Sequence, residues 1–501
     1  MATTPVAAVC AAVLAFGALL ACVLLGVPDA EARGGKKGEK SEAETVFESR
    51  YASSDGKRRG EAVTALKDAP DLLKVELITS MVVPKEKRAD VIMRAVEVLS
   101  RVKDEAAVAK VISLAMNGKP PRRVVFLEAI GKFGGSEAHL ALLKALTDKS
   151  PRVRGMAAFG LGQHRAMDAL EPLLRALDDP HWQVQSAALE SIPRLKDKAR
   201  LKAVAVPALV DFLENVSGRL AADAADKLAR ITGKRLGRDV LKWRKFLAGE
   251  PVTPEGRGDV GGSDGGSASS SGGAYGNAAQ RPHFYGMEVV SNRVVLIVDI
   301  SLSMNEPIEI DKDRLRRETS RRKAITGQKN DVSKPVDEDH SYDIPWWRIK
   351  TRLDLAREQT ILLISQMREE QEFDLIFFST TVESWMGKLV PANSSNKQKA
   401  IVALREMKPD DKTNTWGALA MAFDLMGNEK KSYKKGPDEL YLVTDGAPSV
   451  GDITEQDQIL DAVVQLHKTK PIRVNCIGIG VNLKFMKKMA RATGGKAKFF
   501  K

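Results

Sequence analysis

The sequence predicts a multidomain protein in which an α-solenoid of paired helices is followed by an α/β domain with a doubly wound parallel sheet. Three observations support this assignment. Residues 46–250 read as successive helices, and apolar positions among them recur at a step of 31 residues from Val111 to Ile192, while residues before about 100 match this repeat poorly. Apolar, β-branched runs alternate with helical segments over residues 286–501, which is the pattern of βαβ units. A stretch rich in Gly and Ser, residues 251–285, separates the two regions.

The first 32 residues are expected to be a signal peptide or a membrane anchor. Residues 6–27 are almost wholly apolar, and Ala30-Glu31-Ala32 has the small-x-small pattern of a cleavage site. If the segment is not cleaved, it is long enough to span a bilayer. We therefore expect an exported protein (periplasmic, on the cell surface or secreted) that is either free or anchored. Polar residues 33–45 are expected to be disordered.

Repeated pairs of apolar residues define the helical domain, residues 46–250. They recur every 31 residues, as Val111-Ile112, Leu142-Leu143 and Leu173-Leu174. Asp148 and Asp179 keep the same step and are expected to cap the following helices. Paired amphipathic helices with a fixed step are typical of solenoids. The pattern resembles the short bacterial HEAT-like repeat, which implies an extended binding surface.

Residues 251–285 have little apolar content and read as a flexible linker. The two domains are therefore expected to be tethered rather than fused.

The C-terminal region alternates strands and helices. The expected strands are 293–299, 373–378, 382–385, 439–444, 472–478 and 497–500. The expected helices are 351–369, 395–407, 416–427, 454–468 and 483–492. In such a sheet ligands bind at the carboxyl ends of the strands, where the strand order reverses. Two carboxylates, Asp299 and Asp445, follow the strands that flank this switch point.

Oxygen-bearing side chains gather in three segments at these strand ends. They are Asp299, Ser301, Ser303, Thr413 and Asp445. Magnesium prefers octahedral oxygen coordination and keeps several waters. Hydroxyl ligands can bind the ion directly, and the carboxylates can hold its waters and balance its charge. One coordination position stays open for an incoming carboxylate.

Residues 286–501 resemble the von Willebrand factor type A (VWA) domain, because these five residues match its metal-ion-dependent adhesion site, Asp-x-Ser-x-Ser, then Thr, then Asp. The resemblance implies Mg²⁺, or Mn²⁺ or Ca²⁺, as the cofactor and a protein ligand that presents Asp or Glu. Two plainer readings stay open: a Rossmann-like sheet with ordinary turns, and a VWA fold without metal.

A long charged insert, residues 304–350, departs from the family pattern. It follows the metal loop directly, so we expect it to emerge beside the metal. Either it is a specificity loop that contacts the ligand, or it is a disordered, solvent-exposed segment. If it is a specificity loop, the candidates for ligand contact are Arg316, Arg317, Arg321, Arg322, Trp346 and Trp347.

Catalytic signatures are weak in this sequence. No His-Glu-x-x-His, Cys-x-x-Cys or phosphate-binding loop motif occurs. Cys476 reads as a buried, inert thiol in a strand. The protein is therefore not expected to be an enzyme.

The favoured function is a non-catalytic interaction, adhesion or scaffold protein with two binding surfaces. The formal charge of +13 favours anionic partners, including an anionic polymer or a membrane surface. One alternative is RNA binding, since the Ro ribonucleoprotein family also joins helical repeats to a VWA domain. Export disfavours nucleic acid as a partner. Another alternative is an adaptor of an ATPase or chelatase complex.

Overall fold

The computed structural model describes residues 40–253, 282–308, 348–427, 433–481 and 483–500. The expected signal or anchor segment, most of the Gly/Ser-rich linker and most of the charged insert lie outside these ranges. Among the described helices, none is both long and apolar enough to cross a membrane.

Paired helices form the first domain, as expected. Their bounds are α2 (Glu42–Tyr51), α3 (Gly56–Ala65), α4 (Asp71–Leu77), α5 (Val83–Lys85), α6 (Ala89–Leu99), α7 (Glu105–Met116), α8 (Pro120–Ile130), α9 (Ser136–Ala145), α10 (Pro151–His164), α11 (Leu170–Arg175), α12 (Trp182–Ser191), α13 (Lys198–Arg200), α14 (Val206–Asn215), α15 (Gly218–Thr232) and α16 (Val240–Leu247). Helix α2 begins inside the segment expected to be disordered, because Phe47 and Tyr51 anchor it in the core.

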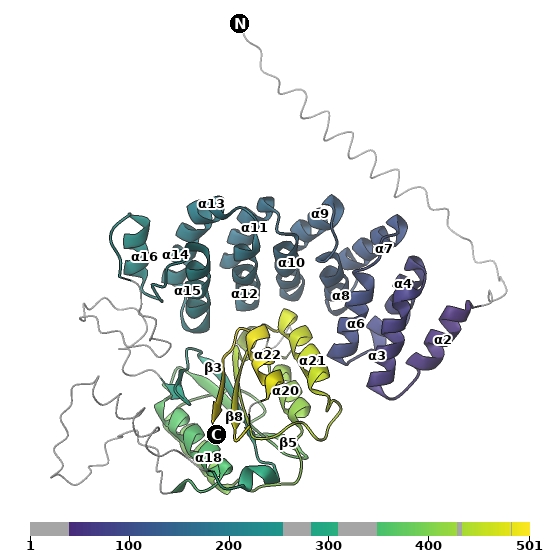
Figure 1. The fold of residues 1–501 in the computed structure, drawn as a ribbon. Coiled ribbons are helices and arrows are strands. Elements are labelled where there is room, and N and C mark those ends of the chain that lie inside the picture. The colour runs from purple at the N-terminus through teal and green to yellow at the C-terminus, as the bar shows by residue number, and fades with distance from the viewer. Residues whose placement is uncertain (1–39, 254–281, 309–347, 428–432, 482, 501) are drawn as a thin grey trace, which may run out of the picture. The chain divides into compact units, whose positions relative to one another are not determined.

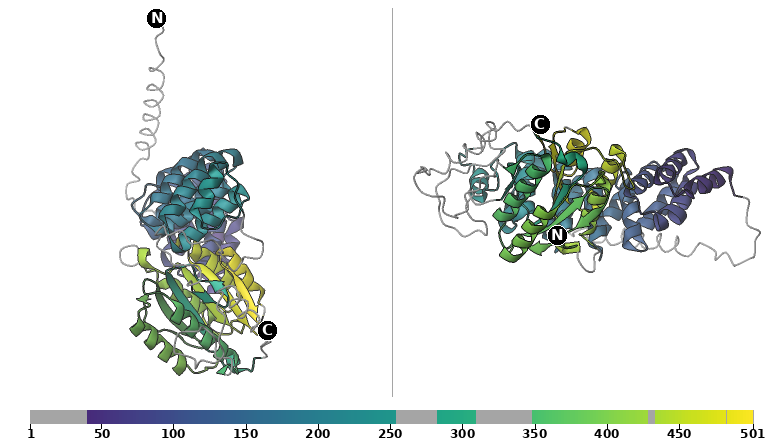
Figure 2. Two further views of the ribbon diagram at one scale, coloured as in Figure 1. Left: turned by 90° about the vertical axis from the view of Figure 1, so that its left-hand side faces the viewer. Right: turned by 90° about the horizontal axis from the view of Figure 1, so that it is seen from below.

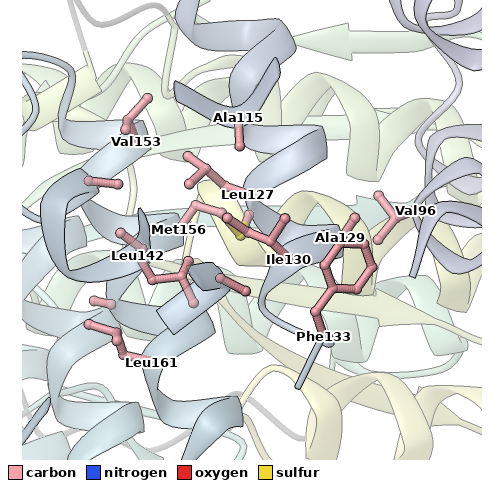
Figure 3. Packing of buried hydrophobic residues seen from close by; sticks show 14 of the residues in the cluster. Val96, Ala115, Leu127, Ala129, Ile130, Phe133, Leu142, Val153, Met156 and Leu161 are labelled. Atoms are coloured by element: carbon pink, nitrogen blue, oxygen red, sulfur yellow. The ribbon is translucent and has the colours of Figure 1, made fainter. Parts of the chain in front are cut away.

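The 31-residue step corresponds to one helix pair. Helices α8, α10, α12 and α15 follow one another in one row, and α7, α9 and α11 form the other row (Figure 1). The repeated apolar positions, such as Val111, Leu142 and Leu173, are fully buried. Figure 3 shows Leu142 close to Met156 and Leu161 in this core.

The two repeated aspartates do not cap helices, which corrects the expectation from the sequence. Asp148 and Asp179 instead accept the backbone N–H two residues ahead, at 2.8 and 2.9 Å. Each also pairs with an arginine from the row of α8, α10, α12 and α15. Arg123 of α8 pairs with Asp148 at 2.8 Å, and Arg154 of α10 pairs with Asp179 at 2.6 Å. A carboxylate that lies outside the first turn can make these charge-assisted bonds.

A mostly parallel sheet forms the second domain. Its strands are β3 (Arg293–Asp299), β4 (Glu372–Phe378), β5 (Val382–Ser384), β6 (Val390–Pro391), β7 (Glu439–Thr444), β8 (Arg473–Ile479) and β9 (Ala497–Phe500). The order is β5-β4-β3-β7-β8-β9, and β6 pairs with β4. The helices are α18 (Arg352–Gln366), α19 (Ser394–Glu406), α20 (Thr415–Asp424), α21 (Gln456–Thr469) and α22 (Lys484–Ala492). The predicted doubly wound α/β domain is confirmed.

Helices cover both faces of this sheet. Helices α18 and α19 pack with Val294, Leu296 and Val298 of β3 on one face. Helices α20, α21 and α22 pack with Val295 and Ile297 on the other (Figure 2). Since both faces are buried, the strands are continuous apolar runs rather than alternating ones.

A small hairpin, β1 (His283–Phe284) and β2 (Met287–Glu288), precedes the sheet. It starts inside the expected linker, because Phe284 is fully buried against Tyr441, with ring centroids 5.3 Å apart. The last residues of that segment are therefore folded. Two strands of two residues each give no recognisable alternation in the sequence.

Side chains of the two domains also touch, which corrects the expectation of domains that are only tethered. Residues 47–501 form one compact unit. Glu128 of α8 accepts a hydrogen bond from Gln465 of α21 at 2.6 Å and pairs with Lys468 at 2.5 Å. Asp223 of α15 pairs with Arg473 of β8. A linker's composition sets its reach, but complementary charges on the domains decide whether they dock.

Candidate metal centre

The switch point of the sheet lies between β3 and β7. From β3 the chain first builds β4 and β5 on one side, and then returns to place β7, β8 and β9 on the other. Strands β3 and β7 are parallel, with Val298 opposite Val443. Their carboxyl ends therefore lie side by side and form the crevice where ligands bind in sheets of this class.

Asp299 closes β3 and is fully buried. Its Oδ1 accepts the backbone N–H of Ser301 at 2.8 Å, and its Oδ2 accepts the hydroxyl of Thr444, the last residue of β7. Both carboxylate oxygens are thus held by the two strands of the switch point. The carboxylate has a single orientation, set by backbone geometry and by the neighbouring strand.

The two serines lie on a short turn after β3, Leu302–Asn305, with Ser301 immediately before it. Their Oγ atoms are 3.1 Å apart. Ser303 also donates its hydroxyl to Oδ1 of Asp445 at 2.7 Å. The i, i+2 spacing therefore brings both hydroxyls to one point, next to the carboxylate that follows β7.

Thr413 reaches the same point from the loop before α20. A Cβ atom added to Gly446 would lie 3.5 Å from Oγ1 of Thr413 and 3.8 Å from Oγ of Ser303. Ser449 fixes the threonine backbone, since its Oγ accepts the N–H of Thr413 at 3.0 Å. The five residues singled out in the sequence thus meet around the ends of β3 and β7.

Burial sets the electrostatics of this site. Asp299 and Asp445 are both inaccessible to solvent or nearly so. Burial raises the pKa of Asp299 to about 7, and the nearby negative charge of Asp445 adds to the shift. Among the described residues no group of three or more His, Cys, Asp and Glu side chains could hold a metal. The donor set here is different: two carboxylates and three hydroxyls, all hard oxygen atoms that suit Mg²⁺.

Two further residues of the site were not foreseen from the sequence. Thr444 orients Asp299, and Arg352 donates from Nη1 to Oδ2 of Asp445 at 2.7 Å. Thr444 directly precedes Asp445, so its side chain could have been suspected. No sequence signal connects Arg352 to Asp445, because 92 residues lie between them.

The six expected ligand-contact residues, Arg316, Arg317, Arg321, Arg322, Trp346 and Trp347, lie outside the described residues. The flanks of the insert are described. Pro307 and Thr351 form an antiparallel bridge, and the N–H of Ile308 donates to the carbonyl of Lys350 at 3.2 Å. The insert therefore leaves and re-enters the domain at one place, a few residues from Ser303.

Two family models match the chain. HEAT repeats match residues 139–229, and the von Willebrand factor type A domain matches residues 353–499. The second match excludes β3 and the two serines, which precede the insert. The structure joins them to the matched part, since β3 is a central strand of the same sheet.

Several curated relatives align with about a third of the chain or less. Human inter-alpha-trypsin inhibitor heavy chain H1 is 29% identical over 146 residues, which are 28% of this chain and 16% of the relative. Bovine heavy chain H4 is 30% identical over 151 residues, which are 28% of this chain and 16% of the relative. Human von Willebrand factor A domain-containing protein 3B is 28% identical over 171 residues, which are 33% of this chain and 11% of the relative. The chain spans less than a fifth of these relatives.

Solved structures match weakly as whole chains. A von Willebrand factor type A protein from Catenulispora acidiphila has a TM-score of 0.28 at 18% identity and covers 42% of this chain and 38% of its own. An aerotolerance-related membrane protein from Bacteroides fragilis has a TM-score of 0.27 at 14% identity and covers 42% and 91%. From the family matches and the fold, the chain is a protein with HEAT repeats followed by a von Willebrand factor type A domain.

Proposed function

We propose that this protein is a non-catalytic interaction protein that captures an acidic protein partner through a Mg²⁺-dependent adhesion site. The observation that carries the proposal is the meeting of two buried carboxylates and three hydroxyls at the switch point of the sheet. A bound Mg²⁺ supplies an electrophilic point for an Asp or Glu carboxylate of the partner.

Each residue of the site has a role in this proposal. Ser301, Ser303 and Thr413 offer neutral hydroxyl ligands, which leave the ion electron-poor and able to accept another carboxylate. Asp299 and Asp445 balance its charge and orient its waters. A carboxylate that binds a divalent ion in a partly dry site gains far more than a surface ion pair.

The helical repeats supply the second binding surface in this proposal. Part of the row of α8, α10, α12 and α15, including Glu128 of α8, already contacts the VWA domain. The row of α7, α9 and α11 is the better candidate, and Leu140 on α9 is 62% exposed there. The VWA relatives, together with the apolar N-terminal segment, support an exported interaction protein.

The test is calorimetric titration of Mg²⁺ and Mn²⁺ into the full chain and into two variants. Asp299→Ala should abolish binding without unfolding the domain. Asp374→Asn is the matched control, because Asp374 is equally buried on β4 but hydrogen-bonds to Ser384 instead. It should bind metal like the wild type.

Partner capture is tested with an immobilised Asp- and Glu-rich peptide and its Asn and Gln counterpart. The acidic peptide should bind only with Mg²⁺, and EDTA should release it. A folded wild type that binds neither metal contradicts the proposal. Binding of RNA with a steep salt dependence would support the nucleic-acid alternative instead.

A further inference from the structure

One guanidinium lies at the edge of the proposed metal site. Arg352 donates from Nη1 to Oδ2 of Asp445 at 2.7 Å, and its Nη2 is 2.7 Å from Oε2 of Glu306. The arginine side chain is 19% exposed, Asp445 is fully buried and Glu306 is 59% exposed. The guanidinium of Arg352 thus joins the buried carboxylate of Asp445 to the exposed carboxylate of Glu306 at the rim of the crevice.

The position of Arg352 is fixed by several chain segments. It is the first residue of α18, whose start is held by a capping box between Thr351 and Asp354. Its backbone N–H donates to the carbonyl of Glu306 at 3.1 Å. After β8, Gly480 adopts φ 72°, and a Cβ there would lie 2.7 Å from Nε of Arg352. The guanidinium therefore packs against a glycine that leaves room for it.

This contact occupies a carboxylate that, in the proposed site, balances the charge of the metal and orients its waters. Ser303 bonds to one oxygen of Asp445 and Arg352 to the other. A fixed positive charge at this distance repels a divalent cation and also neutralises the carboxylate that would attract it. A buried carboxylate without a cation is costly, so the same contact stabilises the domain when no metal is bound.

Resting on the metal site proposed above, we propose that Arg352 is an internal counter-cation that competes with Mg²⁺ for Asp445. It holds the site together without metal and sets the metal affinity below the value that the oxygen donors alone would give. The exposed carboxylate of Glu306 is the acceptor that keeps the guanidinium when the metal displaces it from Asp445.

The experiment is calorimetric titration of Mg²⁺ into the full chain, with Arg352→Gln, Arg352→Lys and the control Arg357→Gln. Arg357 lies on the same helix, is 20% exposed and pairs with Asp354, so its substitution removes a similar charge that contacts neither Asp445 nor Glu306. We expect Arg352→Gln to lower the dissociation constant about tenfold or more. Arg352→Lys should change it less, and Arg357→Gln should leave it unchanged.

Thermal melting gives a second readout. In EDTA, Arg352→Gln should melt below the wild type, and Mg²⁺ should raise its melting temperature more than that of the wild type. If only the variant binds Mg²⁺, the arginine locks the site and the inference stands. If both bind equally, the inference fails and the metal site remains. If neither binds, both fail.

Discussion

At the scale of the residue, Asp299 shows how strand ends create an unusual carboxylate. Burial raises its pKa to about 7, while hydrogen bonds from Thr444 and Ser301 partly oppose the shift. The folded protein therefore binds a proton between about pH 4 and pH 7 that the unfolded chain releases. Without metal, this one group lowers the stability of the fold as the pH rises through that range.

The corresponding prediction concerns Asp299→Asn in EDTA. Because the amide carries no charge and can keep both hydrogen bonds, the variant should be more stable than the wild type at pH 8, by up to about 4 kcal/mol. The difference should shrink as the pH falls and vanish below about pH 3, where Asp299 is protonated in both the folded and the unfolded state. Urea unfolding at a series of pH values measures it.

Saturating Mg²⁺ should reverse the order of stabilities at pH 8, because only the wild type binds the ion. Asp374→Asn serves as a second comparison, since it removes another buried carboxylate whose pKa is raised by burial. That variant should show no reversal with Mg²⁺. An Asp299→Asn variant that is less stable than the wild type in EDTA at every pH would show that the buried charge of Asp299 does not destabilise the metal-free fold.

At the scale of the element, close helix crossings set the repeat. Where α8 and α10 pack, a Cβ on Gly131 would lie 2.9 Å from Cα of Gly160. Backbone cannot move aside as a flexible side chain can. Gly155, also on α10, has room, because its nearest neighbour would be the carbonyl oxygen of Gln183 at 3.9 Å.

Two alanine substitutions should therefore have opposite effects on the free energy of unfolding. Gly131→Ala should destabilise the protein by about 1–3 kcal/mol through overpacking. Gly155→Ala should stabilise it by about 0.5–1 kcal/mol, since alanine restricts the unfolded chain and fits the helix. Chemical denaturation of both variants checks this pair. Equal changes in the free energy of unfolding for the two variants would mean that α8 and α10 do not pack too closely at Gly131 for an added methyl group.

At the scale of the whole molecule, buried charges join the repeats to the VWA domain. Arg473 on β8 lies between Asp223 of the repeat domain and Glu439 of its own sheet. Glu128 meets Gln465 and Lys468 in the same way. Breaking one partner of a buried pair is costly, because the other charge stays buried.

Glu128→Gln is the test of this contact. It should cost about 3 kcal/mol in the free energy of unfolding, because Lys468 is then left without its carboxylate. Glu97→Gln is the control: Glu97 and Arg101 are 53% and 59% exposed, so that pair should contribute less than about 1 kcal/mol.

A double-mutant cycle of Glu128→Gln with Lys468→Met should give a coupling free energy above about 1 kcal/mol. Hydrogen exchange of the α21 amides should quicken in the same variants. Additive effects without faster exchange would show that the two domains do not depend on this pair.

By itself, the sequence predicted the two architectures, and both are observed. It also singled out the five oxygen-bearing residues that the structure brings together, and their role as metal ligands stays a prediction. The 31-residue step and the apolar runs depend only on periodicity, which is local, so the predicted strands end within about one residue of those observed. Asp299 and Asp445 were recognised because a strand end is visible as the last apolar residue before a polar one.

Tertiary structure alone decided the contacts between distant side chains that neither the strand order nor a motif predicts. Arg352 and Asp445 come together because α18 starts beside the end of β7, and no pattern in the sequence records that distance. The hairpin at Phe284 and the contact of Glu128 with Lys468 arise in the same way. Packing and charge complementarity between segments far apart in the chain are properties of the fold, and local periodicity carries no information about them.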